Sequence, residues 1–430
     1  MFRKSALIAS FIVHVLGFVG EAAWETVVIK FRQIALLSRT PRFPELDEPR
    51  NIVIIGASFA GYYAAQVIAS KLPPNSPYRV VIIEPHSHFH FTWVLPRFCV
   101  VDQEQKAFIP YGPLLKGAPE GRVRWVRERV AKVNRNGVWL EKSREQIPYD
   151  FLVVATGSGA AAGLPSRVPV DTKEEGTALL QDMQHNIKQA QHLVVVGGGA
   201  AGVELATDVK HMYPGKFVTL VHSRKAVMHR FGPELQAAAL QGLKDLGIET
   251  VLHERTASSN IVDGQITLQS GRRIRCDFLV NCTGQRATSG IMTELAPEAI
   301  SPTGAIRVKP SLQIQDDKLS NVYACGDVAD VGIDNPNARS ALRQGMVVGF
   351  NIVRAATGGS PTKTYKPFWG ECVIKLTLGL DKSIVHIGNG KTELWWRSKE
   401  KDISLDAAGA WNHLGVKPFQ DDDGPEKQVE

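Results

Sequence analysis

The sequence is poor in cysteine and has no cysteine pair of the kind that carries chemistry. Its cysteines are widely spaced, and none forms a C-x-x-C or C-x₄-C pattern. They are Cys99, Cys276, Cys282, Cys325 and Cys372. Neither a zinc site nor a redox-active dithiol is therefore expected, and hence no disulfide reductase. Reduced, mostly buried thiols are typical of a reducing compartment, so we expect an intracellular protein.

The sequence also lacks an apolar run long enough for a confident membrane span. Residues 6–20 form a run of 15 residues after basic Arg3 and Lys4, short of the roughly 18 that a span needs. An amphipathic stretch, residues 24–37, follows it, and a proline-containing linker ends the segment near residue 50. Segment 1–50 can be an interfacial anchor, a targeting signal or a helix packed on the core. A membrane-associated, a cytoplasmic and a mitochondrial location are all open.

No block of lysine or arginine residues occurs, although the net charge is +7 and the sequence pI is about 9.1. Dispersed basic residues favour a solvated surface over a nucleic-acid-binding tail, so no nucleic-acid partner is expected. The 430 residues exceed what one hydrophobic core usually organises. At least two domains are therefore expected.

The first nucleotide motif begins at residue 51. An apolar strand stops at Gly56, and a helical pattern opens after Gly61. Gly56 suits a tight turn and Gly61 suits close packing of helix on sheet, while Ser58 replaces the middle glycine of G-x-G-x-x-G. The next apolar strand ends in Glu84, whose carboxylate can accept hydrogen bonds from the ribose hydroxyls of an adenine nucleotide.

A second, complete motif follows the strand at residues 193–196. Its three glycines are Gly197, Gly199 and Gly202. The helix N-terminus at such a turn offers free backbone N–H groups to phosphate. The next strand ends in His222, Ser223 and Arg224. An acid at that point would repel a 2′-phosphate, whereas serine and arginine can bind one, so NADPH should serve at least as well as NADH.

Two dinucleotide motifs in one chain predict two different nucleotides, a tightly bound FAD and an exchangeable NAD(P)H. Glu204 follows the second glycine turn directly. It would point towards a nicotinamide lying over the flavin, although an acid near a helix N-terminus is also favoured by the helix dipole alone.

Three further motifs complete the pattern. Two strands end in Thr-Gly turns, Thr156-Gly157 and Thr283-Gly284, and a third ends in Gly326-Asp327. In this order the motifs resemble the two-dinucleotide-binding-domain flavoprotein superfamily. The resemblance implies that the Asp327 carboxylate binds the ribityl chain of FAD. It also implies that the Thr-Gly turns mark crossings between the FAD and NAD domains.

Within that superfamily, residues from 51 to about 394 resemble apoptosis-inducing-factor-like, ferroptosis-suppressor-type NAD(P)H:quinone reductases, which are akin to type II NADH dehydrogenases. The similarity rests on GGGAAGVELA, NVYACGDVADV and the YKP of residues 365–367. It implies that Glu204 lies near the nicotinamide and Lys366 near the flavin edge and the quinone path. The chain begins MFRK where the animal members begin Met-Gly, so it cannot be myristoylated. The loop after Glu84, rich in histidine and aromatic residues, also differs.

We therefore expect an α/β fold with two Rossmann-like domains and a small C-terminal α+β region. The FAD domain should span residues 51–163 and 275–359, the NAD(P) domain 164–274, and the C-terminal region 360–430. His86, His88 and His90 alternate, but no cysteine or acid completes a metal site, so none is expected.

The expected activity is hydride transfer from NAD(P)H to FAD, with electrons passing on to a small acceptor, for which a quinone is the first candidate. The alternatives are a redox-signalling, nucleic-acid-binding flavoprotein like apoptosis-inducing factor, a ferredoxin-reductase-like enzyme, or a tailoring oxidoreductase of specialised metabolism.

Overall fold

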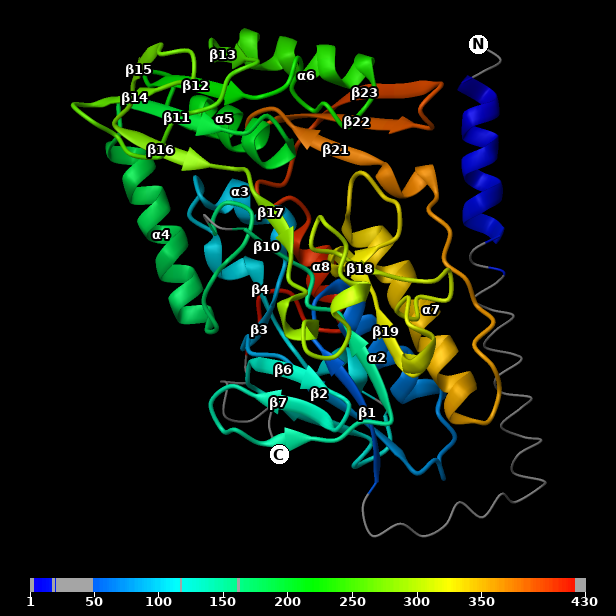
Figure 1. The fold of residues 1–430 in the computed structure, drawn as a ribbon. Coiled ribbons are helices and arrows are strands. Elements are labelled where there is room, and N and C mark those ends of the chain that lie inside the picture. Colours follow the sequence, from blue (N-terminus) through cyan, green and yellow to red (C-terminus); the bar gives the residue numbers. More distant parts are fainter. Residues whose placement is uncertain (1–3, 18–19, 21–48, 117, 161–162, 422–430) are drawn as a thin grey trace.

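Two parallel sheets organise the chain (Figure 1), which we describe from a computed structural model covering residues 4–17, 20, 49–116, 118–160 and 163–421. The first sheet has the strand order β19-β9-β1-β2-β5, and every neighbouring pair is parallel. Its strands are β1 (Arg50–Ile55), β2 (Tyr78–Ile83), β5 (Val123–Val126), β9 (Phe151–Val154) and β19 (Val322–Ala324). These strands are almost continuously apolar, as expected for a parallel sheet covered on both faces.

Two helices pack together over this sheet, α2 (Phe59–Lys71) and α7 (Ala338–Ala356). Their close approach requires glycine. A Cβ added at Gly345 would lie 2.4 Å from the Ala60 carbonyl oxygen, and one at Gly349 would lie 2.7 Å from the Val67 Cβ. The long C-proximal helix α7 is thereby fixed against the helix that follows the first glycine turn.

The second sheet is also parallel, in the order β13-β12-β11-β16. Its strands are β11 (His192–Val196), β12 (Phe217–His222), β13 (Glu249–Leu252) and β16 (Phe278–Asn281), and the helices of this part are α4 (Lys173–Gln189), α5 (Ala200–Met212) and α6 (Pro233–Asp245). The strand β16 lies past residue 275, where the sequence places the return to the FAD domain. The second sheet therefore continues beyond that predicted boundary.

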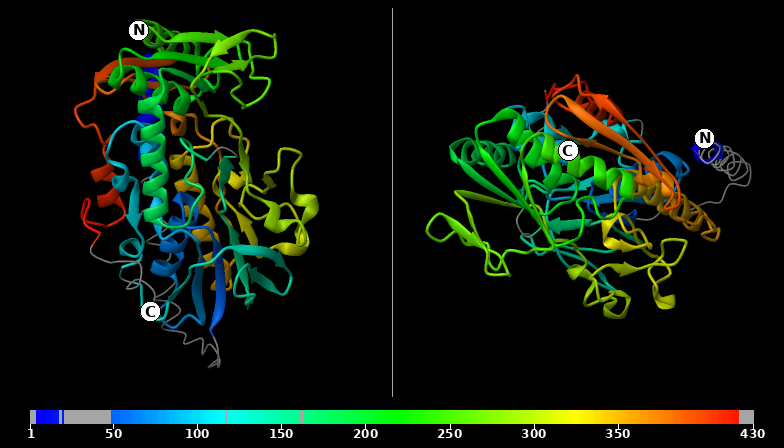
Figure 2. Two further views of the ribbon diagram at one scale, coloured as in Figure 1. Left: turned by 90° about the vertical axis from the view of Figure 1, so that its left-hand side faces the viewer. Right: turned by 90° about the horizontal axis from the view of Figure 1, so that it is seen from above.

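The chain crosses between the two units twice, and the crossings lie side by side (Figures 1 and 2). β10 (Ser158–Ala160) and β17 (Gln285–Ala287) form an antiparallel pair in which Gly159 lies opposite Arg286. Each follows one of the Thr-Gly turns. The remaining short strands form four small sheets. These are β3 (His88–His90) with β4 (Phe108–Pro110), β6 (Val130–Asn134) with β7 (Gly137–Leu140) and β8 (Gln146–Ile147), β14 (Gln265–Thr267) with β15 (Arg273–Arg275), and β18 (Ile306–Arg307) with β20 (Ala329–Asp330).

A small C-terminal region completes the molecule. Its antiparallel sheet contains β21 (Ile374–Thr377), β22 (Lys382–Gly388) and β23 (Glu393–Lys399), and the short helix α8 (Ala407–His413) follows. The predicted fold class, two Rossmann-like units plus a small C-terminal α+β region, is confirmed.

Residues 4–17 form a helix at one side of the molecule, beside the chain that leads into β21 (Figure 1). Leu7 is buried, the Phe11 ring lies 6.2 Å from the Phe368 ring, and His14 stacks on Phe368 at 4.4 Å between ring centroids. None of the described helices has the length and apolar composition needed to cross a bilayer. The amphipathic stretch predicted at residues 24–37 lies outside the described residues.

Candidate functional site

The first glycine turn has the geometry that its sequence predicts. Gly56 has φ +94°, and a Cβ added at Gly61 would lie 1.8 Å from the Gly56 carbonyl oxygen. Ser58 is the N-cap residue of α2, and its side chain makes no capping hydrogen bond. Ala57 N–H donates to Glu84 Oε2 at 2.6 Å. The glycine turn, the N-terminus of α2 and the Glu84 carboxylate at the end of β2 thus lie together.

Glu84 remains an anion despite its burial. Burial alone would raise its pKa, but the His86 imidazole and the backbone N–H groups of Ala57 and His86 outweigh that effect, so the pKa lies below its usual value. A buried carboxylate at the end of β2 is the acceptor that ribose hydroxyls require. The turn and the carboxylate therefore fit the adenosine half of FAD.

The second turn repeats this construction at the N-terminus of α5. Gly197 has φ +119°, and a Cβ added at Gly202 would lie 1.9 Å from the Gly197 carbonyl oxygen. Gly199 is the N-cap residue of α5. Gly197 and Gly199 line a large cavity, together with Ser223 and Arg224 from the end of β12.

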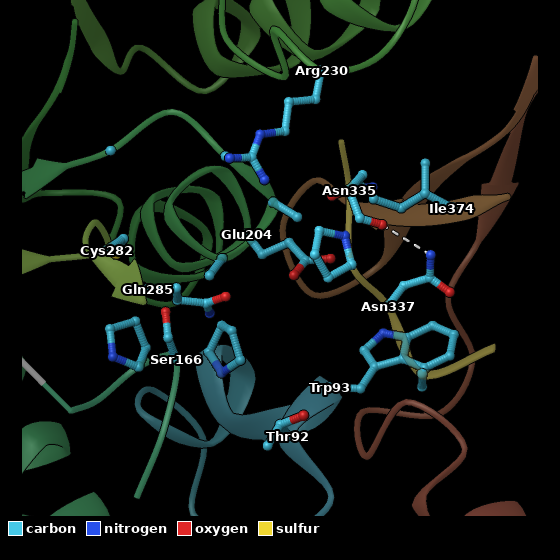
Figure 3. Close-up of a pocket in the computed structure, with 18 of the residues that line it drawn as sticks. Thr92, Trp93, Ser166, Glu204, Arg230, Cys282, Gln285, Asn335, Asn337 and Ile374 are labelled. Carbon is cyan, nitrogen blue, oxygen red and sulfur yellow. Dashed lines mark hydrogen bonds between the residues drawn. The ribbon is translucent and has the colours of Figure 1, made fainter. Parts of the chain in front are cut away.

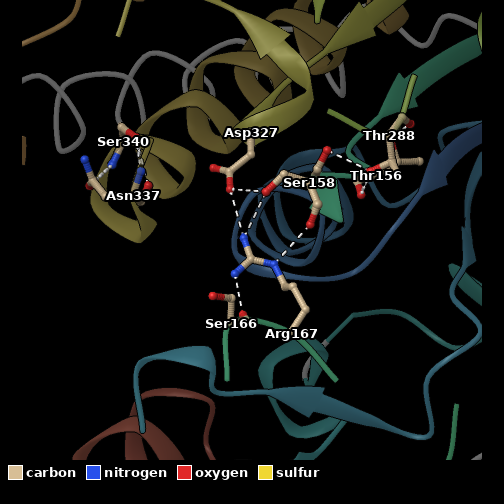
Figure 4. Close-up of polar contacts among 9 residues, drawn as sticks. Thr156, Ser158, Ser166, Arg167, Thr288, Asp327, Asn337 and Ser340 are labelled. Carbon is tan, nitrogen blue, oxygen red and sulfur yellow. Dashed lines mark hydrogen bonds and ion pairs between the residues drawn. The ribbon is translucent and has the colours of Figure 1, made fainter. Parts of the chain in front are cut away.

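The first Thr-Gly turn and Asp327 lie close together where the chain crosses between the units (Figure 4). Thr156 Oγ1 donates to the Thr288 carbonyl at 2.7 Å, and Thr288 Oγ1 donates to the Gly157 carbonyl at 2.8 Å. Thr283 N–H and Oγ1 donate to Asn281 Oδ1, at 2.9 and 2.6 Å. The first crossing is thus tied to the second, and Thr283 is tied to the end of β16. Thr283 and Gly284 also line the cavity.

Asp327 lies at the N-terminal side of α7 with two partners that the sequence did not suggest. Its Oδ2 accepts from Ser158 Oγ at 2.9 Å and from Arg167 Nη2 at 3.2 Å. The preceding Gly326 N–H donates to Gln344 Oε1 at 2.8 Å, which fixes the turn. A carboxylate held among a hydroxyl and a guanidinium fits the polyhydroxylated ribityl chain of FAD. Arg167 was missed because it lies in an irregular segment with no motif around it.

The cavity has a volume of about 1200 Å³ and is lined by α2 and loops of the first unit, by the carboxyl ends of strands of the second sheet and by the C-terminal region (Figure 3). Glu204, the fifth residue of α5, lines the cavity, and its Oε1 accepts a hydrogen bond from Thr377 N–H of β21 at 3.2 Å. Burial raises the pKa of Glu204 to about 8, although the Thr377 hydrogen bond opposes the rise. The predicted position of Glu204 beside a nucleotide is compatible with this geometry, and its carboxyl is neutral at pH 7.

Behind Glu204 lies a buried ion pair that connects three parts of the chain. Arg97 Nε, from α3 (Leu95–Phe98), donates to Asp208 Oδ2 of α5 at 2.7 Å, and both side chains have no exposed surface. Arg97 Nη2 also donates to the Gly379 carbonyl at 3.1 Å, after β21. No sequence pattern indicates this pair, because Arg97 stands in an otherwise apolar run and its partners are distant in the chain.

Lys366 is not brought to the cavity. Its side chain is exposed and it is absent from the cavity wall, to which Lys375 contributes instead. The Lys366 carbonyl accepts from Arg343 Nη1 at 3.5 Å. The neighbouring Tyr365 is buried instead, and the place of Lys366 near a flavin edge stays a prediction.

The histidine-rich loop after Glu84 packs against the first unit through its ring side chains. The His86 and His90 rings are 4.4 Å apart, and Phe89 packs edge-on against Phe59 at 4.9 Å. Within the described part of the chain, no group of three histidine, cysteine or acidic residues could hold a metal ion. Its cysteines are all free thiols.

Comparisons with known proteins agree with this geometry. Residues 50–345 match the family model described as pyridine nucleotide-disulphide oxidoreductase. The chain is 30% identical over 403 residues to the Fe-regulated protein 8 of Mycosarcoma maydis, covering 86% of this chain and 96% of that protein. It is 29% identical over 381 residues to the human ferroptosis suppressor protein 1, covering 86% and 96% respectively. A sulfide:quinone oxidoreductase structure from Aquifex aeolicus shares the fold, with a TM-score of 0.68 at 16% identity and coverage of 85% and 90%.

The family model matches well over half of the chain, and the two relatives match 86% of it over 96% of their own lengths. The two glycine turns, Glu84 and Asp327 fit FAD and NAD(P)H, the cofactors of this family. The chain therefore belongs to the pyridine nucleotide-disulphide oxidoreductase family, as an apoptosis-inducing-factor-like, ferroptosis-suppressor-type, FAD-dependent NAD(P)H oxidoreductase.

Proposed function

We propose that the protein is an NAD(P)H:quinone reductase. The observation that carries the proposal is the aromatic and aliphatic part of the cavity wall. It is made by Phe59 and Tyr63 of α2, Phe91, Trp93 and Leu114 of the following loops, and Ala410 and Leu414 at α8. An apolar wall of this size suits a flat, hydrophobic ring better than a charged acceptor.

The chain's own groups would position the reactants, while bound FAD would accept the hydride and release electrons. The α5 N-terminus at Gly199 offers backbone N–H groups to the nucleotide pyrophosphate. We propose Glu204 as a catalytic residue that contacts the nicotinamide, where its neutral carboxyl can donate a hydrogen bond. The wall of aromatic side chains would exclude water from the same space.

The test is steady-state reduction of several acceptors by the FAD-loaded protein: a long-tailed quinone, a short quinone, ferricyanide, oxygen and a ferredoxin. We expect the quinones to give the highest kcat/KM. Trp93→Gln should raise KM for the long-tailed quinone about tenfold, equivalent to ~1.4 kcal/mol of lost aromatic contact. Trp396→Gln is the matched control, because Trp396 is similarly exposed but lies on β23 outside the cavity wall. Efficient turnover of ferredoxin alone would instead support the ferredoxin-reductase alternative.

We also infer that the helix of residues 4–17 holds the enzyme at a membrane surface. Its exposed face is apolar, with Ile12 at 51%, Val13 at 66% and Leu16 at 65% exposure, while Leu7 packs inward. Such a face can enter the interfacial region of a bilayer. It would bring the cavity close to a lipid-soluble quinone and raise the local concentration of both.

Vesicle cosedimentation tests whether the helix of residues 4–17 binds a membrane surface. The triple variant Ile12→Ser, Val13→Ser, Leu16→Ser should lose binding to phosphatidylcholine–phosphatidylserine vesicles while keeping its FAD and its rate with a short quinone. Val262→Ser, which alters an exposed apolar residue outside the helix, should bind as the unmodified protein does. Equal binding of all three proteins would reject the anchor.

A further inference from the structure

The short helix α8 carries part of the cavity wall. It has only 7 residues, and a helix of this length is not stable by itself in water. Trp411 anchors it, because this side chain is 1% exposed and its Nε1–H donates to the Lys106 carbonyl at 3.0 Å. Ala410, His413 and Leu414 of this part line the cavity. The position of this wall therefore depends on the contacts that hold the two ends of α8.

Strained backbone lies on both sides of α8. Leu405 and Asp406 before it have φ values of +53° and +61°, and Phe419 after it has φ +63°. Bulky side chains rarely adopt this left-handed region, and the strain persists only where surrounding contacts hold it. The first pair is held by the Asp402 carboxylate, which accepts from the N–H groups of Ser404 and Asp406 at 2.9 and 3.0 Å. The turn at Phe419 needs a comparable restraint.

That restraint comes from the chain on either side of Phe419. Its ring packs edge-on against Trp411 at 5.6 Å between centroids, and Lys106 Nζ lies 4.5 Å from its ring centroid. Two residues later, Asp421 Oδ2 forms an ion pair with Lys173, the first residue of α4, and lies 3.1 Å from His88 Nε2 of β3. Asp421 thus attaches the C-terminal segment to β3 and to α4.

Hydrogen bonds around His88 fix which of its atoms donates. The Asp421 carboxylate can only accept, so His88 Nε2 carries the hydrogen, and Nδ1 of a neutral ring accepts from the Ser87 hydroxyl at 2.8 Å. Ser87 Oγ in turn accepts from Lys173 N–H at 3.0 Å. Burial lowers the pKa of His88, which agrees with a neutral ring at pH 7. All three groups are therefore satisfied together, with little exposure of any of them.

The elements that Asp421 joins both carry cavity residues. Phe89 follows His88 in β3, Leu414 ends α8, and both line the cavity. A Cβ added at Gly415 would lie 3.4 Å from Pro113 Cβ, so the chain after Leu414 packs beside the loop that contributes Leu114 to the same wall. Movement of the segment that ends at Asp421 would therefore move one side of the apolar wall relative to the other.

We propose that Asp421 is a positioning residue for the electron acceptor. With Lys173 and His88 it forms a clasp, and this clasp holds α8 against the aromatic residues of β3 and the loop that follows it. None of the three side chains lines the cavity, so the clasp acts on the acceptor only through the wall that it fixes. The effect on acceptor binding rests on the proposed quinone reductase activity, whereas the clasp itself does not.

Steady-state reduction of a short quinone by the FAD-loaded full chain measures the positioning. Asp421→Asn removes the charge but keeps an oxygen that can accept from His88. It should raise KM about fivefold with kcat unchanged, which is within the range for residues of one ion-pair network. Lys173→Met should act alike from the other side of the pair, and the double variant should exceed neither. Asp182→Asn, an exposed carboxylate on α4 outside the cavity wall, is the matched control.

Hydrogen exchange, followed by mass spectrometry, gives a readout without turnover. Amides of residues 407–414 should exchange faster in Asp421→Asn and in Lys173→Met than in the unmodified protein or the control, because opening of the clasp releases α8. The ratio of flavin to protein absorbance establishes that each variant is folded.

Unchanged exchange in residues 407–414 overturns the clasp, as do additive effects of the two substitutions on KM. Faster exchange there with an unchanged KM overturns the positioning role. If the unmodified protein reduces no quinone, the proposed activity fails, and exchange in residues 407–414 still decides whether the clasp holds α8.

Discussion

Replacing Glu204 by glutamine should change how the stability of the protein depends on pH. The pKa of Glu204 is about 8 in the folded chain, against an ordinary value of 4.5, and burial is the main cause. The unfolded chain therefore releases this proton at a lower pH than the folded chain does. Stability is full below about pH 4.5 and falls as the pH rises towards 8.

The magnitude follows from the size of that shift. The unmodified protein should lose roughly 3 kcal/mol relative to Glu204→Gln by pH 7 and ~5 kcal/mol by pH 9, with little difference at pH 4.5. Glutamine keeps the shape of the side chain, and its Oε1 can still accept the Thr377 hydrogen bond. The variant therefore removes the titration without opening a cavity.

The assay is urea unfolding of both FAD-loaded proteins at pH 5, 6, 7, 8 and 9, followed by tryptophan fluorescence. Glu234→Gln is the control, because Glu234 is an exposed carboxylate on α6 and its loss should leave the pH profile unchanged. Parallel profiles for the unmodified protein and Glu204→Gln would refute the reasoning, since they would mean that Glu204 ionises equally in the folded and unfolded chains.

Three other substitutions test the remaining parts of the site. Asp327→Ala should lower FAD affinity about tenfold or more by removing a charged hydrogen-bond acceptor, measured as the ratio of flavin to protein absorbance. Gly61→Ala should yield no flavin-containing protein, because its Cβ would collide with a backbone carbonyl, whereas Gly290→Ala meets nothing within 4 Å and should be tolerated. Arg97→Leu should destabilise the protein by about 3–5 kcal/mol in urea unfolding. Adding Asp208→Leu should restore most of this loss, and failure to do so would count against the buried pair.

Local sequence patterns were enough to predict the nucleotide turns. Gly56, Gly61, Gly197 and Gly202 each stand within a few residues of the strand and helix that need them, so spacing alone predicts their geometry. The position of Glu84 at a strand end followed from the same short-range logic. These features needed no knowledge of how distant segments pack.

The environment of Glu204 could not be predicted in this way. Its raised pKa depends on burial by β21, about which the local sequence says nothing. Arg97 and Asp208 are 111 residues apart and meet only because α3, α5 and the C-terminal hairpin converge. The exposure of Lys366 could not be predicted for a related reason, because a resemblance carries over a motif but not the direction of a side chain.

The Arg97–Asp208 pair links the chemistry of the cavity to the packing of all three parts of the chain. Arg97 donates to Asp208 on α5, one turn from Glu204, and to the carbonyls of Gly379 and Leu380 in the hairpin whose strand β21 covers Glu204. Loosening of that hairpin would admit water to both carboxyls and lower their pKa values together. The raised pKa of Glu204 therefore depends on the packing of the C-terminal hairpin against α5.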